Sequence, residues 1–310
     1  MRWSTRPIHA FFWACPALLL LTSAGTAWEK DPLKLENVPK FDSTSNEPIL
    51  LRYKLKPGQV EKIVVDMEMN MHIKQGAQEF TMKIAMRIEA KDAVSAVDAE
   101  GNMTGVVKIT RMKMKVAGPK EVEFDSDKPT DDPNFKGVTA MIGVGIPCKI
   151  SPVGKMLETD LDPIRQAARR ANDAALAKSF EDSAKQMFDG TYIQLSEKPI
   201  KAGETYKAGT IVSDKVKIHN SYKVLSVSAD KTKTLLEPVA VLEMAPGAFP
   251  PGVDVKMKTQ RVAGWLLFDL QKGHLSKGEI RMLMTMDINA MGQTGTMEMS
   301  MKTTLTSTVE

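Results

Sequence analysis

The sequence predicts a mainly β protein of the α+β class, built on a curved antiparallel sheet or half-barrel with one central helix. Two observations carry this prediction. Apolar and polar residues alternate over long runs at both ends of the chain, and one alanine-rich run of helical period lies between them. Successive side chains of a strand point to opposite faces, so the alternation indicates strands with one apolar and one polar face.

The alternation near the N-terminus predicts a β-hairpin. Residues 63–73 read "IVVDMEMNMHI", and a second alternating run at 80–88 follows the turn-forming "KQGAQE". Two such runs around a glycine-containing turn are typical of an antiparallel hairpin. The predicted apolar face consists of Val65, Met67, Met69, Met71 and Ile73 on one strand and Phe80, Met82, Ile84, Met86 and Ile88 on the other.

The C-terminus repeats this pattern. Residues 280–288 read "IRMLMTMDI", which places Met282, Met284 and Met286 on one face of a strand. After the turn-forming "NAMGQTGT", the apolar positions return as methionines at 297, 299 and 301. A second methionine-rich hairpin is therefore predicted.

Residues 161–188, "LDPIRQAARRANDAALAKSFEDSAKQMF", predict the central helix. Asp162 suits the N-cap and Pro163 the first helical position. The apolar stripe of this helix is thin and alanine-rich, which favours a helix lying across a sheet. A helix that binds a partner or a membrane is the alternative, although the stripe lacks the large apolar residues of interfacial helices.

The chain is predicted to form a single β-rich domain, 49–310, whose two similar halves, 49–156 and 191–310, are joined by the helix. "LKPGQVEK" at 55–62 resembles "IKAGETYK" at 200–207, and paired hairpins follow each. Because β-hairpins resemble one another, coincidence is the alternative explanation for the similarity between the two halves.

Residues 1–27 have the three parts of a secretory signal peptide: the basic Arg2 and Arg6, an apolar core, and the small residues Gly25-Thr26-Ala27. The apolar run is shorter than the roughly 20 residues of a membrane-spanning helix. We therefore expect an extracytoplasmic protein, periplasmic or secreted, with an irregular lead-in at 28–48 and no transmembrane segment after cleavage. Retention of the segment as an anchor is the alternative.

The charge balance gives no reason to expect a nucleic-acid partner. Removing Arg2 and Arg6 leaves 40 of the 42 basic residues against 38 acidic ones, a formal net charge of +2. Both signs are spread along the chain without a basic block, whereas nucleic-acid-binding proteins carry a basic patch or stripe.

The sequence carries no recognisable catalytic motif, so we expect a non-enzymatic protein without a cofactor. His72 and His219 fall on the polar sides of their strands, and His274 falls in a turn. Cys148 is the single cysteine after signal cleavage, and we interpret it as a small buried apolar residue. A reactive thiol or an intermolecular disulfide is the alternative.

The methionine runs allow two interpretations. Thioethers are soft ligands that bind Cu(I), and "MEMNMH" places a histidine beside three of them. In a strand, however, His72 points away from Met67, Met69 and Met71, which share their face with aliphatic residues. We therefore predict no metal site and interpret the methionines as an adaptable apolar surface.

Short motifs give the chain a resemblance to a family. The order "LRYKLKPGQ", "EFDSD", "SPVGK", helix, "KPIKAGETY" resembles an uncharacterised family of exported bacterial proteins, from about Leu51 to the C-terminus. Tyr206 stands where that family often has tryptophan. No catalytic residue is attached to the family, so the resemblance implies none here. It implies an architecture similar to the half-barrels of the lipoprotein carriers LolA and LolB, in which an open sheet and a helix hold acyl chains.

The function predicted from these observations is binding of a lipid-like or hydrophobic small molecule on the concave face of the sheet. The candidate ligand-binding residues are Met67, Met69, Met71, Met282, Met284 and Met286. An envelope structural or interaction protein with a filled core is the alternative, and a copper(I)-binding protein is a third hypothesis. Neither the ligand nor the oligomeric state follows from the sequence.

Overall fold

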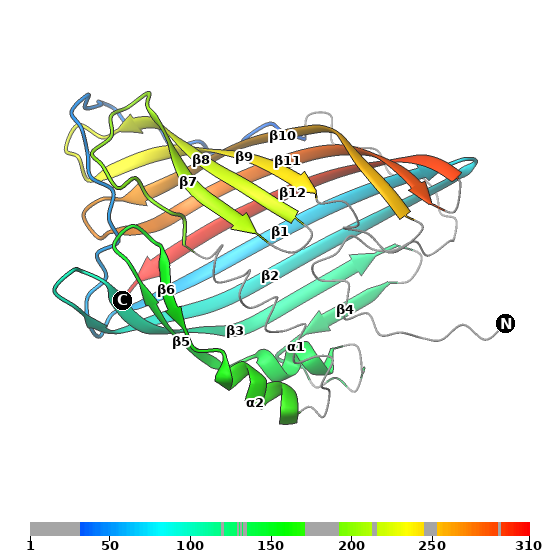
Figure 1. The fold of residues 1–310 in the computed structure, drawn as a ribbon, viewed down its shortest axis with the longest axis horizontal. Helices are drawn as coiled ribbons and strands as arrows, with labels where there is room; N and C mark the ends of the chain where they lie inside the picture. Colours follow the sequence, from blue (N-terminus) through cyan, green and yellow to red (C-terminus); the bar gives the residue numbers. More distant parts are fainter. Residues whose placement is uncertain are drawn as a thin grey trace.

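The computed structural model describes residues 32–118, 121–128, 130, 132, 135–170, 192–212, 216–244, 253–290 and 293–310. Twelve strands form one long, curved antiparallel sheet, with the helices at one side of it (Figure 1). The sheet is open, with β6 and β7 at its two ends, which confirms the predicted fold class. The strands are β1 (Val60–Gln75), β2 (Gln78–Val97), β3 (Met103–Ala117), β4 (Val122–Asp125), β5 (Gly145–Ile150), β6 (Met156–Thr159), β7 (Thr205–Val212), β8 (Val216–Val227), β9 (Lys233–Met244), β10 (Val253–Asp269), β11 (His274–Ala290) and β12 (Gln293–Val309).

The strand order is β6-β5-β3-β2-β1-β12-β11-β10-β9-β8-β7, with β4 also paired to β3. Strands from the first part of the chain thus lie on one side of the sheet and strands from the last part on the other. They meet where β1 pairs with β12. Both predicted methionine hairpins are present as β1–β2 and β11–β12.

Two helices are described. Helix α2 (Asp162–Arg170) begins where the sequence predicted the central helix, and its buried stripe is Ile164, Ala167 and Ala168. The rest of that prediction, 171–188, lies outside the described residues, as does the predicted signal peptide. Helix α1 (Lys136–Met141) was not predicted, because a single turn containing glycine gives no helical period. Among the described helices, none is long and apolar enough to cross a membrane.

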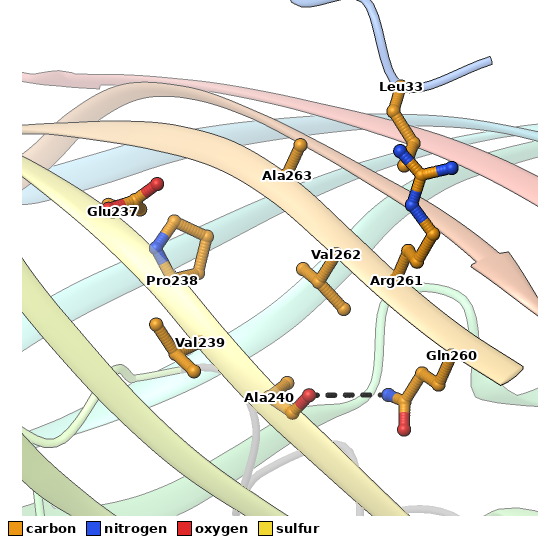
Figure 2. Close-up of a pocket in the computed structure, with 9 residues that line it drawn as sticks. All are labelled: Leu33, Glu237, Pro238, Val239, Ala240, Gln260, Arg261, Val262 and Ala263. Carbon is orange, nitrogen blue, oxygen red and sulfur yellow. Dashed lines mark hydrogen bonds between the residues drawn. The ribbon is translucent and has the colours of Figure 1, made fainter.

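Strands β9 and β10 separate part-way along their length. They pair over four residue pairs, from Leu236↔Leu266 to Lys233↔Asp269, although β9 continues to Met244 and β10 begins at Val253. Beyond Leu266 they diverge (Figure 2), and a cavity of about 680 Å³ lies between them. We call this region the split.

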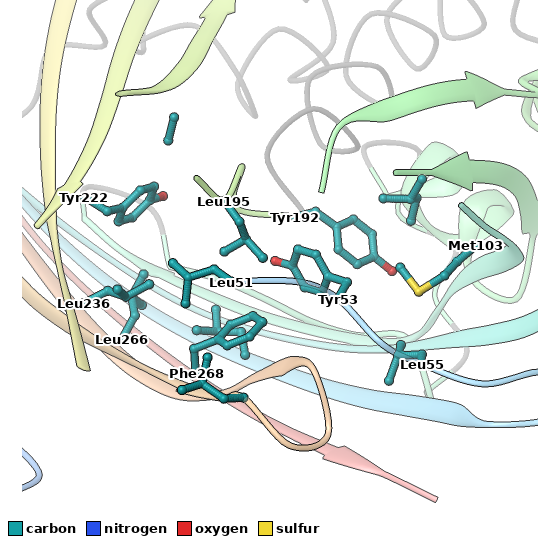
Figure 3. Close-up of a cluster of buried hydrophobic side chains, with 14 of the residues drawn as sticks. Leu51, Tyr53, Leu55, Met103, Tyr192, Leu195, Tyr222, Leu236, Leu266 and Phe268 are labelled. Carbon is teal, nitrogen blue, oxygen red and sulfur yellow. The ribbon is translucent and has the colours of Figure 1, made fainter. Parts of the chain in front are cut away.

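One end of the curve is filled by the main apolar core (Figure 3). Ile146 and Cys148 of β5 belong to the same buried cluster as Tyr222 and Val224 of β8. Because β5 and β8 lie near opposite ends of the sheet, their side chains meet only on its concave face. The segment 49–55 runs through this core, with Leu51, Tyr53 and Leu55 buried. Tyr53 packs edge-on against both Tyr192 and Phe268.

The lead-in crosses the opposite, convex face. The indole of Trp265 donates a hydrogen bond to the Glu36 carbonyl at 3.2 Å, and the Glu36 carboxylate lies 3.4 Å from the guanidinium of Arg281. Arg281 also pairs with the buried Glu279 at 2.7 Å. An arginine that is 1% exposed is thus held between two carboxylates beneath the lead-in.

Candidate functional site

The six predicted methionines lie on one concave face. The register pairs Met69 with Met301 and Met301 with Met282, and one row along it pairs Met71 with Met299 and Met299 with Met284. Directly paired residues point to the same side of a sheet. Strand β12 therefore joins the two predicted groups into a continuous surface. We call this surface the methionine face; on β1, β2, β10, β11 and β12 its methionines are Met67, Met69, Met71, Met82, Met86, Met257, Met282, Met284, Met286, Met297, Met299 and Met301.

The strand register shows that the methionine face is on the concave side of the sheet. Leu266 belongs to the main core and pairs with Gly278, which pairs with Leu305, which in turn pairs with Val65. Since Val65 alternates in step with Met67, the methionines point into the same hollow as the core. Sequence reasoning left the methionines of β2, β10 and β12 out of the candidate set. For β2 and β12, the same alternation that identified the six candidate methionines was present in the sequence and could have identified these as well.

Burial changes along this face. At the hairpin end a second packed cluster includes Met71, Met286 and Met297, which are 1–3% exposed. Toward the main core the side chains are half-buried; these residues are Val65, Met67, Met86, Ile88, Met282, Ile280, Met301 and Leu305. An apolar band between two packed ends is thus partly open to solvent.

This band suits contact with hydrocarbon. Methionine is unbranched and polarizable, so neighbouring methionines adapt to ligands of different shape. His72 is directed to the convex face, where its Nε2 lies 3.1 Å from a carboxylate oxygen of Glu79. The histidine that made a copper site worth considering therefore lies on the other side of the sheet from the thioethers.

A buried polar cluster ends the methionine face at the main core. Glu61 and Asp92 are register neighbours on β1 and β2, and both are less than 5% exposed. Nδ1 of His274 lies 3.3 Å from Glu61 and 3.2 Å from the hydroxyl of Ser307, and that hydroxyl donates a hydrogen bond to Glu61. Tyr192 donates its phenolic hydrogen to Asp92. We call these five residues the acid cluster.

The sequence interpretation of His274 was wrong in one respect. His274 was expected in a turn, but it is the first residue of β11 and is 3% exposed. Its partners lie 213 and 33 residues away along the chain. A turn residue is placed by the strands around it, so no local pattern predicts its burial.

Burial, followed by the charge of the adjacent Glu61, raises the pKa of Asp92 from 3.8 to about 7. Among the described residues its Oδ1 has no hydrogen-bond partner. A buried carboxylate favours its neutral form unless it is paired, so Asp92 holds a proton below about pH 7.

Cys148 is 4% exposed, which confirms its interpretation as a buried residue. Burial, followed by the charge of Asp92, raises the pKa of its thiol to about 12. A thiol with so high a pKa stays protonated near neutral pH and is a poor nucleophile.

The sequence matches no protein-family profile and no curated protein. The resemblance to an uncharacterised exported family therefore stays a prediction.

Solved structures do match. A structure of lipovitellin, described for its lipid–protein interactions, is 9% identical with a TM-score of 0.50, and the match covers 83% of this chain and 26% of that one. An outer membrane channel from Pseudomonas putida F1 is 6% identical over 88% of this chain and 100% of that one, with a TM-score of 0.23. A DUF1329 family protein from Desulfovibrio piger is 10% identical over 76% and 83%, with a TM-score of 0.14.

The last two similarities are too weak to carry an argument. The chain spans about a quarter of the length of lipovitellin, and 9% identity speaks for the fold alone. The comparisons thus establish one thing, which is that this open antiparallel sheet is similar in fold to part of lipovitellin.

Proposed function

We propose that the protein is an exported, non-enzymatic binding protein that holds a lipid-like or other hydrophobic small molecule on its methionine face. The observation that carries the proposal is the half-buried apolar band, which spans the four adjacent strands β2, β1, β12 and β11 between two packed clusters. Apolar surface left open to water is costly, and a concave apolar surface is typical of a ligand site.

The fold adds support by analogy. Part of lipovitellin, a protein studied for its lipid interactions, has a similar fold. Export rests on residues 1–27, whose basic, apolar and small-residue segments are those of a secretory signal. In this proposal residues 49–310 act as one binding domain, and Met67, Met69, Met71, Met282, Met284 and Met286 contact the ligand.

The test compares two neighbouring residues of β12. Met301 lies in the middle of the methionine face, and Ser300 points to the other face; both are half-buried. A fluorescent fatty acid is titrated into the wild type, Met301→Glu and Ser300→Glu. We expect Met301→Glu to weaken binding by at least about tenfold, because a carboxylate beside hydrocarbon must be desolvated or protonated, while Ser300→Glu binds as the wild type does.

Native mass spectrometry and solvent extraction of the purified wild type complete the test. A co-purified lipid-like molecule, absent from Met301→Glu, is the expected result. If nothing is extracted and the fluorescent probe does not bind the wild type, the proposed function is refuted. Titration of Cu(I) against a competing chelator decides the copper hypothesis, and we expect no metal uptake.

A further inference from the structure

The separation of β9 from β10 has a local cause. The Ala240 carbonyl and the Leu242 N–H of β9 both point toward β10, where the side chain of Gln260 contacts them. Backbone groups of alternate residues point to the same strand edge, so the edge position of Pro238 also faces β10. Proline has no N–H to continue the ladder. Its ring also packs against Gly264, where an added methyl would lie 2.8 Å from the proline Cγ.

A side chain holds the two strands together beyond that point. The carboxamide of Gln260 accepts a hydrogen bond from the Leu242 N–H at 2.9 Å. It also donates a hydrogen bond to the Ala240 carbonyl at 3.3 Å (Figure 2). It replaces the ladder bonds that a closely paired β10 would make. Two side-chain hydrogen bonds break more easily than a cooperative ladder of backbone bonds.

The residues that line the cavity of the split belong to both faces of the sheet. Val239 and Arg261 line it with side chains on the convex face, as the pairing of Arg261 with Leu283 places that residue opposite the methionine face. Val262 and Gln260 line it from the concave face. The residues lining the cavity thus come from both faces of β9 and β10.

Two of the lining residues are register neighbours of the methionine face. Val262 pairs with Met282, and Gln260 pairs with Met284. Both methionines were predicted to contact a ligand, so two residues that line the split are direct neighbours of the proposed binding surface.

We propose that the split is a lateral passage through which the hydrocarbon chain of a single-chain amphiphile reaches the methionine face, with Gln260 as its latch. This inference rests on the proposed function. The convex mouth carries Glu237 and Arg261 beside Leu33, so it suits the polar end of such a molecule while the chain lies within. Its volume of about 680 Å³ is within the range of small-molecule sites.

Two valines of β9 provide a matched test. Val239 and Val241 are on the same convex face, 45% and 52% exposed, and Val239 alone of the two lines the cavity. Stopped-flow association of a fluorescent fatty acid is measured for Val239→Trp and Val241→Trp. We expect the bulk at 239 to slow association and dissociation by about tenfold at unchanged affinity, since a block in a route alters both rates equally. The same bulk at 241 leaves the rates unchanged.

Gln260→Ala tests the latch in the opposite direction. Loss of two hydrogen bonds favours the open split, so association becomes faster by up to about tenfold. If Val239→Trp binds the probe as fast as Val241→Trp does, or if Gln260→Ala is no faster than the wild type, the passage is refuted while the proposed function stands. If the wild type itself binds no probe, the proposed function fails and the passage fails with it.

Discussion

Two carboxyl groups side by side in an apolar core make the acid cluster a costly arrangement. Asp92 and Glu61 are register neighbours, and the hydroxyls of Tyr192 and Ser307 and the ring of His274 are the polar groups that face them. Deprotonation of Asp92 places a second negative charge beside Glu61 in a medium of low dielectric constant. The acid cluster therefore destabilises the folded protein most at alkaline pH, where Asp92 is deprotonated.

The first prediction is that stability falls as pH rises from about 4 through 7. The folded pKa of Asp92, about 7, is above its ordinary 3.8, so folding favours the protonated form and this contribution is lost as pH passes the folded value. The difference between the two pKa values corresponds to at most about 4 kcal/mol. Asp92→Asn keeps the acceptor for Tyr192 and removes the charge, so its stability should change little between pH 5 and pH 8.

Urea denaturation of both proteins at pH 5 and pH 8 measures this difference. Asp66→Asn is the control, because Asp66 is on β1 in an ion pair with Arg87 that lies on the surface of the sheet. A wild type whose free energy of unfolding is the same at both pH values would contradict the assignment of a neutral Asp92.

At the scale of single residues, the sequence predicts to which face of the sheet each strand side chain points. Alternation placed Met67 and His72 on opposite faces without any knowledge of their neighbours. The acid cluster could not be predicted from the sequence. Glu61 stands at a concave position of β1 in step with Val65, and nothing near it in the sequence shows which residues will be its partners. Its partners arrive from 31 to 246 residues away through the folding of other strands.

Glycines on the concave side allow the strands to curl. Gly105, Gly264, Gly278 and Gly295 all occupy concave positions, and a methyl added at each would lie 2.4–2.8 Å from a neighbouring atom. Concave side chains crowd as a sheet bends, and glycine relieves that crowding.

The second prediction compares two glycines at the ends of β3. An added methyl at Gly105 would lie 2.7 Å from the Ala93 carbonyl oxygen, whereas at Gly118 its nearest neighbour is the Met82 Cγ at 3.7 Å. We expect Gly105→Ala to lower the free energy of unfolding by about 1 to 3 kcal/mol, because the backbone must shift to accept it. Gly118→Ala should have little effect. Equal denaturation midpoints for the two variants would show that crowding does not require glycine here.

The split shows why an element can be predicted and its pairing missed. "TLLEPVAVLEM" alternates well enough to predict a strand, and the proline within it is a signal that pairing is interrupted on one edge. The sequence does not say which strand lies on that edge. In the sequence Gln260 looks like any strand residue. Its role follows only from the separation of β9, which gives its carboxamide two backbone partners.

At the scale of the whole molecule, the lead-in covers part of the convex side. It covers Trp265, which is 2% exposed, and supplies the Glu36 carboxylate to Arg281 and Lys302. Without it, a tryptophan and a buried ion pair would face water on an otherwise polar surface.

The third prediction uses Trp265 as a reporter. A chain beginning at residue 32 has Trp265 as its single tryptophan, and so does a chain beginning at residue 49. We expect the shorter chain to show red-shifted tryptophan emission and a free energy of unfolding lower by about 1 to 3 kcal/mol, from the loss of hydrogen bonds to buried groups. Glu36→Ala in the longer chain should reproduce part of the stability loss. Identical emission from both chains would mean that the lead-in does not cover the indole.

The pairing of β1 with β12 also dictates the order of events during folding. The two strands lie at the middle of the sheet, yet they come from opposite ends of the chain, with contacts such as Lys62 to Glu310 separated by 248 residues. Contacts this distant form slowly, since a long loop must close first. The sheet cannot be completed until the last strand has been synthesised. A chain that ends before β12 lacks the strand that joins β1 to β11, and its sheet is left in two separate parts.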